Sequence, residues 1–153
     1  MSHVVEILTA ASPTAPMTVH ARIRAVAGSG LEGDRYALGT GTFAKVPQQP
    51  DFEVTLVEEE ALAAFARESG LAFTAAQARR NLVTRGVALN ALVGVEFSVG
   101  PVRLRGQRLC EPCNYLAKIT SPEVLRGLVH RGGLRARILS GGVIAVGDAL
   151  TLT

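Results

Sequence analysis

The sequence predicts a mainly β fold, a closed or partly closed antiparallel barrel with a few peripheral helices. Three observations lead to this prediction. Short stretches that alternate between apolar and polar residues outnumber the helical stretches. Turn residues separate these stretches at short intervals, as they do in barrels. The chain has 153 residues, 48% hydrophobic and 19% charged, which suits one domain over residues 1–153 with no internal repeat or linker.

The first two expected strands lie near the N-terminus. HVVEIL, at 3–8, reads as a strand, and a proline-broken connection follows it. The stretch 17–26 has His20, Arg22 and Arg24 on one face, which is typical of a half-buried strand. Its inward-facing positions are Val19, Ala21, Ile23 and Ala25. A glycine-rich loop follows at 28–43, and loops of this length are usually functional or mobile.

Two helices are expected in the middle of the chain. A strand at 52–58 runs into a helix that ends at Gly70. The apolar face of that helix consists of Ala61, Leu62, Phe65 and Ala66. Farther on, Thr74 and Gln77 have the spacing of a capping box at the start of a short helix. Near its far end this helix would present Arg79, Arg80 and Asn81.

The C-terminal part is expected to consist mostly of strands. Residues 95–104 alternate on both sides of a Gly-Pro turn and predict a hairpin. Ser121 as N-cap and Pro122 at the first helical position predict a helix that ends at Gly132 and Gly133. Three short closing strands follow, in LRARIL, GGVIAVGD and ALTLT.

Composition narrows the expected location and partners. The N-terminus does not resemble a signal peptide, and no apolar run is long enough to span a membrane. We therefore expect a cytoplasmic protein that does not bind membranes. A net charge of +3 is too small to indicate binding to nucleic acid. The expected assembly is a monomer or a homodimer.

The two cysteines of the chain, Cys110 and Cys113, stand in RLCEPCNYL. A structural zinc site takes about four nitrogen or sulfur ligands, and the three histidines show no paired spacing. A thioredoxin-like pair belongs to a βαβ unit, whereas a hairpin precedes Cys110. If Pro112 opens a helical turn, that turn and the basic neighbours would favour a thiolate at Cys113. Two interpretations stay open, a reactive Cys113 or two buried thiols.

Two further segments are candidates for binding an anion. The glycines of GLEGDRY permit turns with exposed N–H groups, and Asp34 and Arg35 could pair with each other or bind a ligand. A plain turn with a local ion pair is the alternative. Arg79, Arg80 and Arg85 lie within seven positions, and arginines this close often indicate a nearby anion. A solvated helix end is the alternative there.

Four segments taken together resemble the MOSC domain family, named after the C-terminal domain of molybdenum cofactor sulfurase. They are GLEGDRY, ARRNLVTRGVALNALVGVEFSVGPVRLRG, LCEPC and GGLRARILSGGVIAVGD, in matching order and spacing. The resemblance covers about residues 17–153. It implies a MOSC-type β-barrel with flanking helices, in a protein that binds the molybdenum cofactor (molybdopterin) or handles its sulfur.

The resemblance also implies roles for individual residues. Cys113 corresponds by position to the cysteine that ligates molybdenum in the reducing members, so it would be the catalytic and metal-binding residue. Cys110 receives no role. The implied cofactor-binding residues are Arg79, Arg80 and Asn81 in one segment and Gly33, Asp34 and Arg35 in the other signature loop.

The implied activity is that of an oxidoreductase that reduces N-hydroxylated bases or related small molecules. Molybdenum accepts a soft thiolate beside the two sulfurs of its cofactor. Two cysteines cannot hold a four-cysteine iron–sulfur cluster, so electrons would come from a separate donor protein. The alternative is a carrier of persulfide sulfur or of the cofactor, without turnover. A third possibility is an anion-binding or interaction domain with inert thiols.

Overall fold

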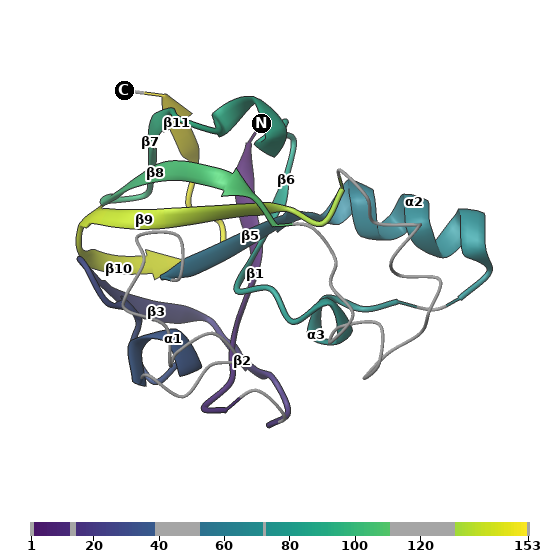
Figure 1. Cartoon of the computed structure of the whole chain (residues 1–153), viewed down its shortest axis with the longest axis horizontal. Helices are drawn as coiled ribbons and strands as arrows, with labels where there is room; N and C mark the ends of the chain where they lie inside the picture. The colour runs from purple at the N-terminus through teal and green to yellow at the C-terminus, as the bar shows by residue number, and fades with distance from the viewer. Residues whose placement is uncertain (1, 13–14, 39–52, 72, 111–130, 153) are drawn as a thin grey trace.

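Two β-sheets form the body of the protein (Figure 1). The computed structural model describes residues 2–12, 15–38, 53–71, 73–110 and 131–152. Within these residues the larger sheet is made of β1 (His3–Thr9), β2 (Thr18–His20), β5 (Val54–Glu58), β6 (Leu82–Arg85), β7 (Glu96–Val99), β8 (Val102–Leu109), β9 (Leu134–Ser140) and β11 (Leu150–Leu152). The smaller sheet is made of β3 (Arg22–Val26), β4 (Gly30–Leu31) and β10 (Gly142–Ala145).

The strand order confirms the predicted β-rich, partly closed barrel. In the larger sheet it is β11-β7-β8-β9-β5-β6-β1-β2, and in the smaller sheet β10-β3-β4. Among the described strands, neighbours pair antiparallel except β5 and β6, which run parallel. Parallel strands need a crossover connection. Here the crossover carries α2 (Glu59–Ser69) and α3 (Ala75–Ala78).

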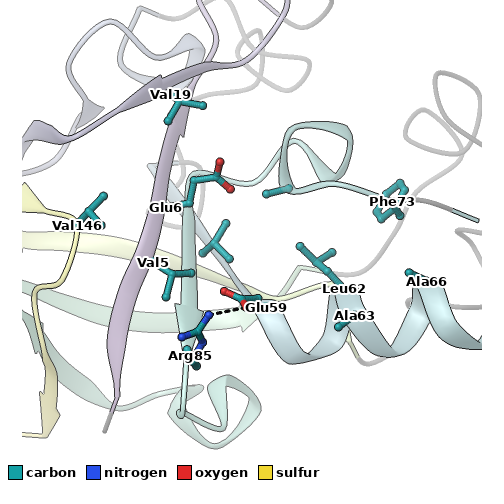
Figure 2. Close-up of a pocket in the computed structure, with 12 residues that line it drawn as sticks. Val5, Glu6, Val19, Glu59, Leu62, Ala63, Ala66, Phe73, Arg85 and Val146 are labelled. Carbon is teal, nitrogen blue, oxygen red and sulfur yellow. Dashed lines mark hydrogen bonds and ion pairs between the residues drawn. The ribbon is translucent and has the colours of Figure 1, made fainter.

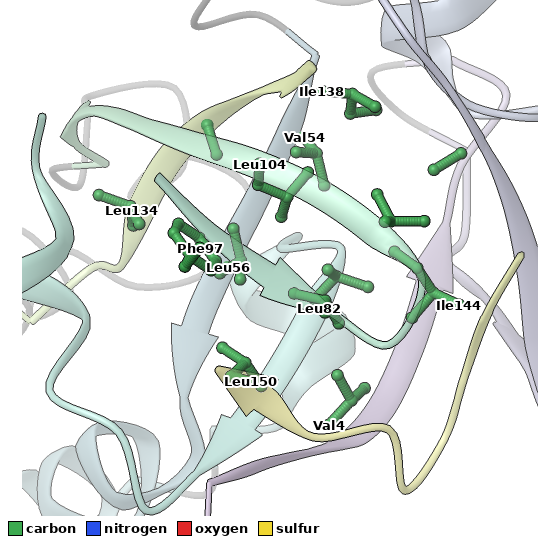
Figure 3. Close-up of a cluster of buried hydrophobic side chains, with 14 of the residues drawn as sticks. Val4, Val54, Leu56, Leu82, Phe97, Leu104, Leu134, Ile138, Ile144 and Leu150 are labelled. Atoms are coloured by element: carbon green, nitrogen blue, oxygen red, sulfur yellow. The ribbon is translucent and has the colours of Figure 1, made fainter. Parts of the chain in front are cut away.

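The main core lies between the two sheets. Figure 3 shows side chains from several strands converging there. Strand alternation explains the arrangement, because Val102, Leu104 and Gly106 of β8 all lie on the inner face and are buried. Both sheets contribute, with Leu56, Leu82 and Leu104 from the larger sheet and Ala25, Leu31 and Ile144 from the smaller.

A second apolar cluster covers the outer face of β1, β5 and β6. It consists of Leu8, Val57, Leu62, Phe65, Phe73, Ala78 and Val83. α2 ends at Gly70 in the left-handed conformation, as predicted. The predicted capping box of α3 is also present, with the N–H of Gln77 donating to Thr74 and the N–H of Thr74 donating to Gln77. No helix in the described part of the chain is long and apolar enough to cross a membrane.

The structure departs from the predicted elements in two places. The expected strand at 17–26 is two strands, because the chain passes from the larger sheet to the smaller at Ala21. The predicted inward positions are therefore wrong for Val19, which is 60% exposed, and for Ala21. The glycine-rich loop contains β4 and the short helix α1 (Arg35–Leu38). The helix expected after Ser121 lies outside the described residues.

Candidate functional site

The segments singled out in the sequence meet along a row of residues that crosses neighbouring strands. The N–H of Leu8 on β1 donates to the carbonyl of Asn81, just before β6, at 2.8 Å. Asn81 contacts Thr55 on β5, and Thr55 lies opposite Arg135 on β9. Arg108 on β8 also lies opposite Arg135. The chain then continues from this end of β8 into LCEPC, so the topology brings four distant segments together.

Asp34 and Arg35 form a buried ion pair at the start of α1. Nη1 of Arg35 lies 3.1 Å from Oδ1 of Asp34, which also accepts the N–H of Ala10 at 3.0 Å. Nη2 of Arg35 donates to the carbonyl of Arg79 at 3.0 Å. Gly33, with a φ of +81°, makes the turn that leads into the pair. The loop therefore fastens α1 to the end of β1 and to the arginine segment.

Arg79 and Arg80 are adjacent in sequence but point to different parts of the chain. Arg79 ends α3 in the left-handed conformation, with a φ of +57°, so the backbone turns sharply there. Its guanidinium donates to the carbonyls of Ala15 at 2.8 Å and Ser12 at 3.1 Å. Arg79 thus holds the connection between β1 and β2.

Arg80 joins the two ends of the connection between β8 and β9. Its Nε donates to the carbonyl of Gly132 at 2.8 Å, and its Nη2 donates to the carbonyl of Cys110 at 3.1 Å. Its Nη1 donates to the carbonyl of Ala78 at 3.2 Å. All three acceptors carry no formal charge. Each Nη atom makes one of the two hydrogen bonds that it can donate.

Asn81 is fully buried and bonds to two strands. Its Oδ1 accepts the N–H of Thr55 at 3.0 Å and the Thr55 hydroxyl at 3.1 Å. Its Nδ2 donates to the carbonyl of Leu8 at 3.1 Å. The Asn81 amide therefore fixes the spacing of β1 and β5 where the site residues begin.

Tyr36 and Arg135 join the site, although sequence reasoning assigned them no role. The guanidinium carbon of Arg35 lies 4.7 Å from the centre of the Tyr36 ring, a cation–π contact. Nη1 of Arg135 donates to the Tyr36 hydroxyl at 3.5 Å. The strand alternation of LRARIL places Arg135 on the outer face, but only the register of β5 and β9 brings it to this row.

Three arginines of the site are buried. Arg35, Arg80 and Arg135 are each no more than 9% exposed, and Asp34 forms an ion pair with Arg35. Burying a charge is costly unless an opposite charge offsets it. Burial also raises the pKa of Glu53 next to β5, and the N–H of Ile138 and the charge of Arg137 offset part of that effect. The guanidinium groups of the site are of the kind that bind anions.

Of the two cysteines, Cys110 lies within the described residues and Cys113 does not. Cys110 is 1% exposed, its N–H donates to the carbonyl of Gly133 at 2.7 Å, and its thiol is free. This matches the interpretation of a small core residue for Cys110. Cys113, with Pro112 before it, lies outside the described residues. Its predicted role is therefore untested.

A groove of about 580 Å³ lies elsewhere, between α2 and the outer face of β1 and β6 (Figure 2). Arg85 lines it and forms an ion pair with Glu59 at 2.7 Å. The third arginine of the sequence cluster thus points away from Arg80, toward α2. The other charged residue of the lining is Glu6.

Known proteins share this fold. The profile of the MOSC domain matches residues 31–151. YuaD from Bacillus subtilis has a similar structure, with 14% identity, a TM-score of 0.81, and coverage of 98% of this chain and 94% of that one. YiiM from Geobacillus stearothermophilus has 18% identity and a TM-score of 0.75, and 75% of its chain matches the whole of this one. YiiM from Escherichia coli has 19% identity and a TM-score of 0.70, and 70% of its chain matches the whole of this one. No curated protein matches in sequence. Because the profile spans most of the chain, the protein belongs to the MOSC domain family.

Proposed function

We propose that this protein binds the molybdenum cofactor and reduces N-hydroxylated bases or related small molecules, with the Cys113 thiolate on the metal. One observation carries the proposal. The buried guanidiniums of Arg35, Arg80 and Arg135 gather where β8 leads into the LCEPC segment of a MOSC domain. Such a cluster suits a cofactor that carries a phosphate.

The residues present fit the anionic part of the cofactor. Arg80 keeps one further N–H on each Nη, so it can bind a phosphate while holding Cys110 and Gly132. Asp34 orients Arg35, and Gly33 shapes the loop that presents them. The Asn81 amide is engaged with Thr55 and Leu8. We therefore propose that Asn81 acts through the strands that it joins, with Arg79 fixing the neighbouring connection.

The position of Cys113 in the chain is consistent with this site. Cys113 comes three positions after Cys110, and an extended chain covers at most about 11 Å over that length. Arg80 binds the Cys110 carbonyl, so its positive charge lies close to the start of this stretch. Nearby guanidiniums favour the thiolate, which is the form that binds metal. When bound, the cofactor supplies two-electron redox chemistry.

The proposed overall reaction balances with an external reductant. A hydroxylamino group, R–NHOH, takes up two electrons and two protons and gives R–NH2 and water. A separate donor protein is oxidised by two electrons in total. The role of the chain is to hold the cofactor beside an accessible pocket, to keep Cys113 ionised and to admit the small substrate.

The test compares Cys113→Ala with Cys110→Ala, the same chemical change three positions earlier. All proteins are made in cells that synthesise the cofactor, and molybdenum per chain is measured. Turnover of a hydroxylaminopurine is then followed with reduced methyl viologen as the donor. We expect molybdenum in the wild type and in Cys110→Ala, and loss of turnover in Cys113→Ala. Well-folded wild type without molybdenum, or full turnover in Cys113→Ala, would overturn the proposal.

In the alternative function, a sulfur carrier, the thiol of Cys110 would need to be accessible. To resolve a persulfide on Cys113, the Cys110 thiol would have to reach solvent or its neighbour. At 1% exposure it lies in the core instead, which favours the reductase. Mass spectrometry of the purified protein with and without reductant measures any added sulfur. A stoichiometric persulfide without turnover would favour the carrier.

A further inference from the structure

Arginines line the outer face of two neighbouring strands. They are Arg103, Arg105 and Arg108 on β8 and Arg137 on β9, and we name them the β8–β9 arginine strip. All four are exposed. β8 and β9 lie side by side across the sheet (Figure 1). The opposite faces of the same strands point into the main core, so alternation directs Arg103, Arg105 and Arg137 outward. An irregularity between Gly106 and Arg108 brings Arg108 to the same face.

The register of the two strands sets like charges against each other. Arg105 lies directly opposite Arg137, and Arg108 lies opposite Arg135. Like charges directly opposite on adjacent strands are destabilising. Glu96 on β7 contacts both Arg103 and Arg105, the latter at 4.0 Å, and the charge of Arg137 acts on Glu53. The facing guanidiniums of Arg105 and Arg137 are nevertheless exposed, so a negatively charged partner can approach them.

We propose that the β8–β9 arginine strip is the docking surface for an acidic electron-donor protein. The inference rests on the proposed function, which requires such a donor. The strip follows β8 toward the site, since Cys110 comes five residues after Arg105, about 17 Å along an extended strand. A donor docked on the strip would lie along the strand that leads to Cys110, three positions before the proposed metal ligand in sequence.

The chemistry of the strip favours an acidic protein over other anions. Guanidinium groups bind carboxylates through two parallel hydrogen bonds. Single-stranded nucleic acid is usually held by aromatic side chains on which bases stack, and neither β8 nor β9 contains an aromatic residue. The net charge of the whole chain is +3, low for a protein that neutralises many phosphates of a duplex. The electrostatic field of a chain with this net charge suits the steering of a transient protein partner.

The binding test uses a plant-type [2Fe–2S] ferredoxin, an acidic redox protein, as the probe. The strip variant is Arg105→Gln with Arg137→Gln. The matched control is Arg22→Gln with Arg67→Gln, which removes two exposed arginines from β3 and α2. A third protein, Arg105→Lys with Arg137→Lys, keeps the charge. Circular dichroism and urea unfolding check that every variant is folded.

We expect the strip variant to bind the ferredoxin about tenfold more weakly at low salt, with a shallower dependence on salt. The control and the lysine variant should bind within about twofold of the wild type. Absence of ferredoxin binding to the wild type, or equal weakening in the control, would overturn the inference. Strip-dependent binding of duplex DNA or of anionic vesicles, with none of ferredoxin, would also overturn it.

Turnover separates this inference from the proposed function. Reduced methyl viologen is a small donor that needs no docking surface, so the strip variant should keep full turnover with it. With reduced ferredoxin, turnover of the strip variant should fall in proportion to binding. If viologen supports no turnover in any protein but binding to ferredoxin depends on the strip, the proposed function fails and the docking surface stands. Equal ferredoxin-driven turnover in the wild type and the strip variant would overturn the docking surface alone.

Discussion

The outer face of the larger sheet has two halves that differ in composition and in what covers them. Over β1, β5 and β6 the outward side chains are apolar, and α2 and α3 pack on them. Over β8 and β9 the outward side chains include Arg103, Arg105, Arg108 and Arg137, which are exposed. The inner face is apolar under both halves. Among the described residues, one half is therefore covered by the chain's own helices, whereas the other presents exposed arginines.

The largest expected effect comes from removing a buried side chain between α2 and the helix-covered half of the sheet. Phe65 is 1% exposed, and its ring packs edge-on against Phe73 at 5.2 Å between centroids. Phe65→Ala removes a large buried side chain, and we expect the free energy of unfolding to fall by about 3–5 kcal/mol. Urea unfolding measures the change. Leu152→Ala, at a residue that is 71% exposed, is the control and should cost less than about 0.5 kcal/mol. A loss below about 1 kcal/mol for Phe65→Ala would mean that α2 packs loosely.

The second test addresses Arg80, which stands between the two halves. Its guanidinium binds three backbone carbonyls, two of them at the ends of the connection between β8 and β9. Arg80→Ala leaves these carbonyls without their donor, and we expect a loss of about 2–4 kcal/mol. Arg80→Lys should recover only part of it, because an ammonium cannot reproduce the planar fork.

Hydrogen exchange adds a local measurement for the same residue. The N–H of Cys110 bonds to the carbonyl of Gly133, and both lie beside the Arg80 contacts. Faster exchange at Cys110 in Arg80→Ala than in Arg80→Lys would support the assigned role. Unchanged stability and exchange in both variants would show that the guanidinium does not hold these ends together.

Local chemistry in the sequence predicted much of the fold. The helix ending at Gly70, the capping box at Thr74 and the Gly-Pro hairpin are confirmed, because each depends on residues close in sequence. The break at Ala21 was missed, since it is set by which sheet each half of the stretch joins. Apolar alternation cannot tell one long strand from two that join different sheets.

The binding roles of the selected residues stay predictions, but the structure shows their contacts. The Arg79 carbonyl meets Arg35, Arg80 reaches the end of β8, and Asn81 joins β1 to β5. Their engagement with backbone carbonyls depends on residues as much as 73 positions away, as for Asn81 and Leu8. Tyr36 and Arg135 were missed for the same reason, because strand register alone brings them together.

The smallest expected effect concerns the half of the outer face that carries arginines, over β8 and β9. Arg105→Gln removes a like charge opposite Arg137 and loses only a marginal contact with Glu96 at 4.0 Å, while Arg103 keeps its closer ion pair with Glu96. We therefore expect the free energy of unfolding to rise by about 0.2–0.5 kcal/mol at low salt. At about 1 M salt the Debye length is near 3 Å, so the difference should disappear. Arg103→Gln is the control and should not stabilise the fold, since it breaks an attractive pair. A loss above about 1 kcal/mol in Arg105→Gln would mean that Arg105 serves the fold itself. The repulsion across β8 and β9 would then no longer distinguish this half from the helix-covered one.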